Sequence, residues 1–255
     1  MNRKEDFIAV FDSGVGGISV LRHLIRQLPG ERFLYYGDSA NAPYGTRSRE
    51  AVRDLTFAVV EKLLPRGLKA LVVACNTATS AAISELRAAW PQLIIVGIEP
   101  AVKLACDRFP GGTIGVMATE MTLREGKFSE LMHRFDGEEQ ILRLPAPGLV
   151  ELVEQGKGNS PEAAALLEPI LGPWRGKLDA VVLGCTHYPF AARAISQVLG
   201  PQVPLMDGGD GTARETLRRL READLLENGE GALLLENSTG DPAMTALSRQ
   251  LLKEQ

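Results

Sequence analysis

Short apolar runs alternate with longer amphipathic stretches along the whole chain. We expect strands at the apolar runs, which are residues 7–11, 33–36, 70–74, 94–97, 113–117, 140–144, 180–184, 204–206 and 232–236. The amphipathic stretches predict helices at residues 18–28, 49–64, 79–89, 123–134, 162–171 and 211–226. Because strands that alternate with helices build parallel sheets covered on both faces, the pattern predicts an α/β fold.

A weak internal repeat divides this α/β pattern into two halves. Residues 67–75 resemble residues 177–185, at an offset of 110 residues, and residues 8–13 resemble residues 114–119, at an offset of 106. Two copies of one α/β unit account for both offsets. We therefore expect two pseudo-symmetric, flavodoxin-like domains with parallel-type sheets. The first would contain residues 1–97 and 207–255, so that the C-terminal strand and helix complete it, and the second residues 98–206.

Each copy of the repeat ends its buried strand with a cysteine, Cys75 in the first and Cys185 in the second. Polar residues and then a helix follow each of them. A cysteine just before a helix N-terminus lies at the positive end of the helix dipole, which favours a thiolate. Ligands of open parallel sheets bind at the carboxyl ends of strands, so both cysteines are expected to open toward one cleft. The third cysteine, Cys106, falls in an amphipathic stretch and is interpreted as a packing residue.

Composition excludes several other functions. The net charge of −4 disfavours nucleic-acid binding, which usually needs a basic face. Apolar stretches stay well short of the roughly 18 residues of a membrane span, and the first residues are polar and charged, unlike a signal peptide. We expect a cytoplasmic protein with neither a membrane nor a nucleic-acid partner. An odd number of cysteines, three, in a reducing compartment also argues against a disulfide framework.

Cofactor motifs are missing from the sequence. The glycines at 14, 16 and 17 do not complete the dinucleotide pattern G-x-G-x-x-G, and no phosphate-loop motif is present. A zinc site built from Cys75, Cys185 and His187 lacks the close cysteine pairs of structural sites and an obvious fourth ligand. Inversion of a carbon centre without a cofactor needs a base on one face and an acid on the other. Two thiols suit this chemistry, because one can rest as thiolate while the other keeps its proton.

Five short motifs appear in an order that resembles the glutamate racemases and span nearly the whole chain. They are Asp12-Ser13-Gly14, Pro43-Tyr44-Gly45, Cys75-Asn76-Thr77-Ala78, Ala118-Thr119 with Thr122, and Gly184-Cys185-Thr186-His187-Tyr188-Pro189. The resemblance implies two domains with the active site in the cleft between them. It also implies a reaction without pyridoxal phosphate, another cofactor or a metal. The substrate would be L- or D-glutamate, and the product D-glutamate would supply peptidoglycan synthesis.

The same resemblance assigns roles to individual residues. Cys75 and Cys185 match the two acid/base thiols, with Cys75 taking the proton from D-glutamate and Cys185 from L-glutamate. Three polar residues match groups that assist catalysis: Asp12, His187 and Glu154. Ten residues match substrate-binding positions: Asp12, Ser13, Tyr44, Gly45, Asn76, Thr77, Thr119, Thr122, Thr186 and His187. The sequence leaves the oligomeric state open, with a homodimer as the candidate.

Alternative functions stay open at this point. Aspartate-specific relatives tend to carry histidine near position 79 and glutamate at position 187, so Thr79 and His187 favour glutamate over aspartate or a related amino acid. A non-enzymatic amino-acid binding protein would explain the hydroxyl and amide side chains but neither cysteine. A cysteine hydrolase would use one nucleophile and one base, which leaves the second cysteine without a role.

Overall fold

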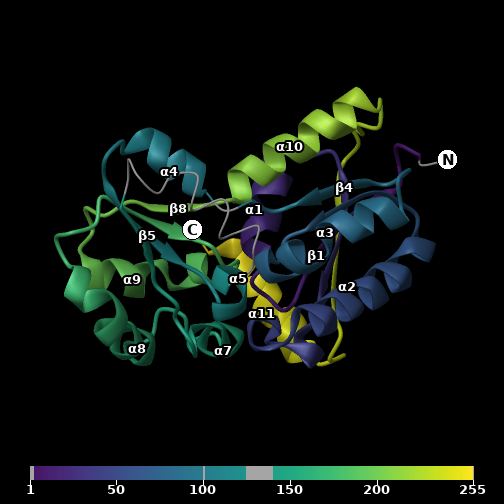
Figure 1. Ribbon diagram of the computed structural model, residues 1–255. Coiled ribbons are helices and arrows are strands. Elements are labelled where there is room, and N and C mark those ends of the chain that lie inside the picture. The colour runs from purple at the N-terminus through teal and green to yellow at the C-terminus, as the bar shows by residue number, and fades with distance from the viewer. Residues whose placement is uncertain (1–2, 100, 125–139, 255) are drawn as a thin grey trace. The chain divides into compact units, whose positions relative to one another are not determined.

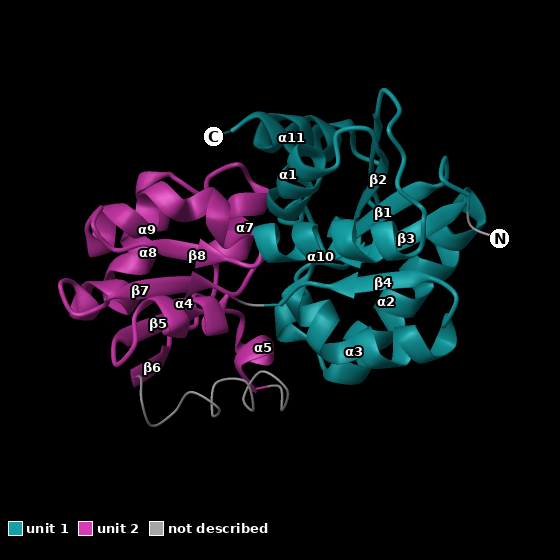
Figure 2. Cartoon of the chain, turned by 90° about the horizontal axis from the view of Figure 1, so that it is seen from above, with its two compact units in different colours: residues 1–99, 209–255 teal, residues 100–208 magenta. Residues whose placement is uncertain are grey.

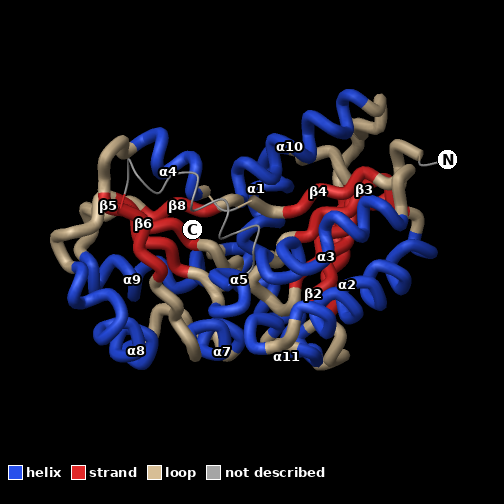
Figure 3. The backbone as a smooth tube through the Cα atoms, in the orientation of Figure 1, coloured by secondary structure: helices blue, strands red, loops and turns tan. Residues whose placement is uncertain are grey.

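The computed structural model describes residues 3–99, 101–124 and 140–254 (Figure 1). Strands lie at all the expected runs, with ends shifted by up to two residues. They are β1 (Phe7–Asp12), β2 (Arg32–Gly37), β3 (Leu68–Val73), β4 (Ile94–Gly97), β5 (Thr113–Met117), β6 (Gln140–Arg143), β7 (Ala180–Leu183), β8 (Leu205–Asp207) and β9 (Ala232–Asn237). Every pairing between them is parallel, which confirms the α/β class (Figure 3).

Helices follow most strands of the described chain. They are α1 (Ile18–Gln27), α2 (Arg49–Leu63), α3 (Asn76–Ala89), α4 (Val102–Arg108), α5 (Glu120–Arg124), α7 (Leu149–Glu154), α8 (Pro161–Leu171), α9 (Ala192–Leu199), α10 (Gly209–Glu222) and α11 (Pro242–Lys253). The helix expected at 123–134 falls mostly outside the described residues. Ser160 and Asp241 cap α8 and α11, each directly before a proline that starts the helix.

The strand order repeats between the two sheets. The first sheet has the order β4-β3-β1-β2-β9 and the second the order β6-β5-β7-β8. If β5 to β8 stand for β1 to β4, the order β4-β3-β1-β2 becomes β8-β7-β5-β6, which is the second sheet read from its other edge. Four strands of each sheet thus follow the flavodoxin order 2-1-3-4. The fifth strand differs from flavodoxin, because β9 adds beside β2 and not beside β4.

The chain forms two compact units, Met1–Glu99 with Gly209–Gln255, and Pro100–Gly208 (Figure 2). In the first unit, α1, α10 and α11 cover one face of the sheet, and α2 and α3 cover the other. This arrangement follows from right-handed crossovers, because the chain moves toward one edge through α1 and toward the opposite edge through α2 and α3.

The core of the second unit shows how its sheet alternates. Val181 and Leu183 pack with α7, α8 and α9, whereas Ala180 and Val182, on the opposite face, pack with α4. Cys106 is buried in this second cluster, as expected of a packing residue. Successive side chains of a strand point to opposite faces, so an apolar strand can supply both layers.

Two helices, α3 and α10, differ from the sequence expectation by two residues or more. Helix α3 begins at Asn76, three residues before the expected start, because Cys75 caps it. Helix α10 runs from residue 209 to 222, not from 211 to 226. It ends early because Asp224 adopts a left-handed conformation (φ 53°) and Leu225 N–H bonds back to Leu220 O at 2.9 Å. Aspartate tolerates this backbone region better than most residues.

None of the described helices is both long enough and apolar enough to cross a bilayer.

Candidate active site

Chemistry-bearing residues gather at equivalent strand ends of the two units. In the first unit, β1 and β3 are neighbours, and Asp12 and Cys75 lie at their carboxyl ends. In the second unit, β5 and β7 are neighbours, and Thr119 and Cys185 follow them. Each pair of strands forms the point where the strand order reverses, which is where doubly wound sheets bind ligands.

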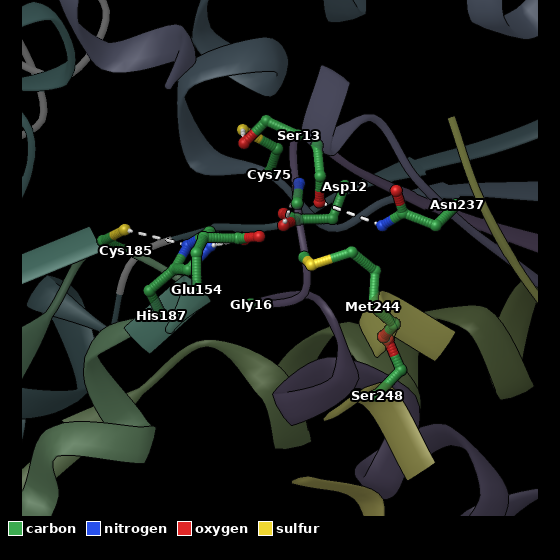
Figure 4. A network of polar contacts seen from close by, with 12 residues as sticks. Asp12, Ser13, Gly16, Cys75, Glu154, Cys185, His187, Asn237, Met244 and Ser248 are labelled. Atoms are coloured by element: carbon green, nitrogen blue, oxygen red, sulfur yellow. Dashed lines mark hydrogen bonds and ion pairs between the residues drawn. The ribbon is translucent and has the colours of Figure 1, made fainter. Parts of the chain in front are cut away.

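Cys75 is the N-cap residue of α3. Its Sγ accepts a hydrogen bond from the backbone N–H of Ala78 at 3.4 Å, and its thiol donates to Ser13 Oγ at 3.4 Å (Figure 4). The side chain is buried, with 4% of the residue exposed. The Ala78 N–H and the helix N-terminus place partial positive charge beside the sulfur, which stabilises negative charge there. Once the thiol has lost its proton, the Ser13 hydroxyl can rotate and donate to the sulfur.

The loop after β1 holds Asp12 against the start of α1. Asp12 is fully buried and its Oδ2 accepts the N–H of Gly14 at 3.1 Å. A Cβ at Gly17 would lie 2.5 Å from Asp12 Cβ, so no other residue allows this approach. Tyr35 donates its hydroxyl to Gly14 O at 2.5 Å from the neighbouring strand. The position of Asp12 is therefore fixed from three sides.

Tyr44 and Gly45 form a single 3₁₀ turn, Tyr44–Thr46, in the loop after β2. The Tyr44 hydroxyl donates to the buried carboxylate of Asp38 at 2.7 Å, and the Asn41 amide donates to both oxygens of that carboxylate at 3.1 Å. Burial and then the hydrogen bond to Asp38 raise the pKa of Tyr44 far above its ordinary value. Tyr44 therefore stays a neutral phenol, and its hydroxyl hydrogen forms the hydrogen bond to Asp38.

The first turn of α3 carries Asn76 and Thr77, which are 5% and 4% exposed. Among the described residues, neither amide atom of the Asn76 side chain has a hydrogen-bond partner. A buried amide without partners costs about 1–3 kcal/mol, so its atoms need a water, an ion or another bound polar group as partner. Asn76 therefore points to a polar ligand at the start of α3.

Cys185 belongs to a chain of three side chains in the second unit (Figure 4). Its Sγ lies 3.8 Å from His187 Nδ1, and His187 Nε2 lies 2.7 Å from Glu154 Oε1, at the last residue of α7. Burial by itself lowers the pKa of His187, but the hydrogen bonds to Cys185 and Glu154 outweigh it and raise the pKa well above 6.5. A protonated ring donates from both nitrogens, so it can stabilise negative charge on Cys185.

A helix follows the polar residues after Cys185, as expected, but it does not begin at the cysteine. Residues Tyr188–Ala191 form a 3₁₀ segment, and α9 starts only at Ala192. Pro189 explains the delay, because a proline inside the first turns removes a backbone donor. Cys185 is thus not a helix cap like Cys75.

Three predicted threonines also lie in the second unit. Thr119 Oγ1 donates to Thr122 Oγ1 at 2.9 Å and accepts the Thr122 N–H at 3.3 Å, at the start of α5. Thr186, the residue between Cys185 and His187, is buried. Among the described residues, no group of three or more His, Cys, Asp or Glu side chains is placed to hold a metal ion.

The structure divides the predicted site residues into two groups. Asp12, Ser13, Tyr44, Gly45, Cys75, Asn76 and Thr77 lie in the first unit, and Thr119, Thr122, Glu154, Cys185, Thr186 and His187 lie in the second. Sequence reasoning gave no role to Asp38 or Tyr35, which hold Tyr44 and the loop after β1. A buried tyrosine needs a partner for its hydroxyl, so Tyr35 carried a signal that was not used.

These features define a class: two-unit parallel α/β proteins with a buried cysteine at the same strand end of each repeat. The chain belongs to the Asp/Glu/Hydantoin racemase family, whose model matches residues 8–216. A glutamate racemase of Clostridium kluyveri is 49% identical over 258 residues, which cover 100% of both chains. The chain is also similar to the solved glutamate racemase RacE1 of Bacillus anthracis, with a TM-score of 0.87, 32% identity, and coverage of 99% of this chain and 96% of that one.

A second solved relative was determined with ligands. The Escherichia coli glutamate racemase, in complex with L-glutamate and the activator UDP-MurNAc-Ala, gives a TM-score of 0.82 at 32% identity. The match covers 97% of this chain and 92% of that one.

Proposed function

We propose that this chain interconverts L- and D-glutamate by moving the α-proton between Cys75 and Cys185. The observation that carries the proposal is the pair of buried cysteines after β3 and β7, at equivalent places in a repeated sheet. Each cysteine also has neighbouring groups that can stabilise its thiolate form. Family membership and 49% identity to a glutamate racemase support the same reaction.

The proposed chemistry needs one thiolate and one thiol in each turnover. With L-glutamate, the Cys185 thiolate takes the α-proton, and the Cys75 thiol donates its proton to the opposite face of the α-carbon. With D-glutamate the roles exchange. In each direction the α-carbon gives one proton to one sulfur and receives one from the other, so the thiol and the thiolate exchange places and no electron is gained or lost.

The groups around each thiol have distinct tasks in this proposal. Ser13 and the start of α3 stabilise charge on Cys75, and Asp12 lies fixed in the neighbouring loop. On the other side, His187 donates to Cys185 and Glu154 keeps the ring protonated. In other acid/base sites, too, an acidic residue orients a histidine and stabilises its protonated form.

Glutamate is the proposed substrate because the first unit offers polar groups that can bind it. The buried Asn76 amide has no partner within the described part of the chain, and Tyr44 and Gly45 lie in a turn fixed by Asp38. Thr77, Thr119, Thr122 and Thr186 complete the proposed set of hydrogen-bonding residues. His187 at its position, with Thr79, favours glutamate over aspartate, and the E. coli relative was solved with L-glutamate.

The wider setting follows from this assignment. We propose two domains, residues 1–97 with 207–255 and residues 98–206, each of which supplies one thiol to the reaction. A supply of D-glutamate for peptidoglycan, made in the cytoplasm by a homodimer, fits an enzyme of this class. The proposed reaction uses no cofactor.

A direct assay tests the function. The dialysed protein is incubated separately with L-glutamate, D-glutamate, L-aspartate and D-aspartate, and the opposite enantiomer is quantified by chiral chromatography. We expect both glutamate enantiomers to be inverted and aspartate to be inverted far more slowly. Activity that requires pyridoxal phosphate, or that chelator abolishes and zinc restores, would contradict the two-thiol proposal. Tight binding of glutamate without inversion would favour a binding protein.

A further inference from the structure

Glu154 and His187 come from separate segments of the second unit, yet their side chains meet at 2.7 Å. Glu154 ends α7, whereas His187 precedes the 3₁₀ segment Tyr188–Ala191. A short contact between two segments persists only if the backbone around both of them is held. The residues that follow Glu154 supply such a connection.

The chain leaves α7 through a Schellman motif. Gly156 has φ +72°, its N–H bonds to Val153 O at 2.9 Å, and the N–H of Lys157 bonds to Leu152 O at 2.7 Å. This pair of bonds is the standard way to end a helix with a left-handed glycine. The direction of the chain just after Glu154 is therefore fixed.

Two residues further on, this chain reaches the segment that follows His187. A Cβ at Gly158 would lie 2.5 Å from Phe190 O, so the two backbones are in close contact. Asn159 makes three hydrogen bonds across the contact. Its Nδ2 donates to Phe190 O at 2.8 Å, and its Oδ1 accepts the N–H groups of Arg193 and Ala194 at 3.0 and 3.2 Å.

Asn159 thereby caps α9 from a distance. The residue before α9, Ala191, has no side chain that could cap it. The orphan N–H groups of a helix start need acceptors, and here a single distant amide provides them. The same amide satisfies the carbonyl of Phe190, so it fixes both the 3₁₀ segment and the first turn of α9.

We propose that Asn159 is a positioning residue that holds Glu154 within hydrogen-bond distance of His187, and so sets the geometry of the Cys185 acid/base group. This proposal rests on the proposed function only for its effect on rate. Asn159 itself touches neither the thiol nor the imidazole. Among the described residues, the titratable groups that act on His187 are Cys185 and Glu154.

Ser160 provides a matched control. It is the next residue, and its Oγ caps α8 by accepting the Ala163 N–H at 3.2 Å. Loss of either cap costs stability on the order of 1 kcal/mol. Ser160→Ala therefore removes a cap in the same loop without touching the segment after His187.

The first measurement is an NMR titration of the His187 imidazole in the wild type, Asn159→Ala and Ser160→Ala. Glu154 raises the pKa of His187, so loosening their contact should lower that pKa in Asn159→Ala and leave it unchanged in Ser160→Ala. This readout does not require racemase activity. Equal His187 pKa values in all three proteins would overturn the positioning role.

The second measurement isolates each thiol. In a Cys75→Ala background, deuterium exchange at the α-carbon of L-glutamate depends on Cys185. In a Cys185→Ala background, exchange of D-glutamate depends on Cys75. We expect Asn159→Ala to slow the first exchange about ten-fold and the second by less than about two-fold, since a misplacement of about 1 Å can cost about 100-fold. Equal slowing of both exchanges would show a general loss of structure and overturn the proposal.

Two further outcomes are distinguishable. If the wild type does not exchange or invert glutamate, the proposed function fails, while the titration still tests the role of Asn159. If Asn159→Ala does not fold, Asn159→Asp keeps an oxygen that caps α9 and loses only the donation to Phe190. The same changes are then expected at smaller size, and their absence would overturn the proposal.

Discussion

The two units share a strand order but support their cysteines differently. Cys75 caps α3 and contacts Ser13, so a helix N-terminus and a hydroxyl stabilise its charge. Cys185 precedes a 3₁₀ segment and relies on His187 and Glu154. The comparison teaches that the repeat sets where a thiol lies, whereas local residues set which groups contact it.

The opposite ends of the same strands show a similar divergence. Lys69 and Asp179 occupy equivalent positions of the repeat. Lys69 is fully buried, pairs with the equally buried Glu31 at 2.5 Å and donates to Leu225 O at 3.0 Å. Asp179 instead accepts the backbone N–H of Thr113 at 2.8 Å. The first unit thus has a buried ion pair at this position, where the second unit has hydrogen bonds between Asp179 and Thr113 at the start of the neighbouring strand.

The largest effect is expected from removing either thiol. Cys75→Ala and Cys185→Ala should each reduce inversion of glutamate by about 10³-fold or more, because general acid and base each contribute about 10² to 10⁴. Cys106→Ala, which alters a packing cysteine of α4, is the matched control and should retain most of the rate. Inversion is measured by polarimetry from each enantiomer. Near-normal inversion in either cysteine variant would mean that one thiol is enough, which contradicts the need for two bases.

Loss of the buried ion pair in the first unit should lower the free energy of unfolding more than loss of the equivalent hydrogen bond in the second. Lys69→Met leaves the Glu31 carboxylate buried without its partner and should lower the free energy of unfolding by about 3–5 kcal/mol. Asp179→Ala removes one hydrogen bond at the equivalent position and should cost about 1 kcal/mol. Urea unfolding of both variants measures the difference. Equal losses would mean that the ion pair gives the first unit no special stability.

Glu154→Gln should change the pH dependence of the Cys185 group more than that of Cys75. Loss of the carboxylate charge removes a cause that raises the pKa of His187, so the imidazole pKa should fall. The pH profile of the wild type should have an acidic and an alkaline limb, because each turnover needs one thiolate and one thiol. In the variant, the limb that belongs to the Cys185 group should move more than the other. A profile displaced equally on both limbs would contradict separate activation.

The smallest expected effect concerns stability against pH. The pKa of His187 is raised in the folded state, so protonation stabilises the fold. This contribution is fully present below the ordinary histidine value of about 6.5 and is lost as pH rises through the raised folded value. The stability difference between the wild type and His187→Gln should therefore be larger in acid than in alkali. Thermal unfolding at several pH values measures it, and a difference that grows with pH would contradict the assignment.

The strands could be predicted from sequence because each is a short apolar run between polar turns. Helix starts were harder where the cap is unusual. Cys75 is not among the common capping residues, so the sequence pattern does not indicate that Asn76 and Thr77 form the first turn of α3. The 3₁₀ segment at Tyr188 depends on Pro189. A prediction based on the pattern of apolar residues does not take this proline into account.

The site was predictable to a different depth. Resemblance supplied Glu154, and its contact with His187 depends on how α7 ends, which spacing along the chain does not reveal. Asp38 was visible in the same loop as Tyr44, but the bond between them depends on the fold of that loop. Contacts made through loops require coordinates, whereas strand-end positions follow from the repeat.

Exchange at the α-carbon tests the central claim that two thiols act on opposite faces. Each single cysteine variant is incubated in heavy water with pure L-glutamate or pure D-glutamate, and incorporation of deuterium is followed by NMR. We predict that Cys75→Ala retains exchange of L-glutamate and loses that of D-glutamate, and that Cys185→Ala gives the mirror result, with no inversion in either. A reversed preference in both variants would exchange the assigned faces and leave two bases in place. Exchange of both enantiomers together with inversion in either variant would contradict the account.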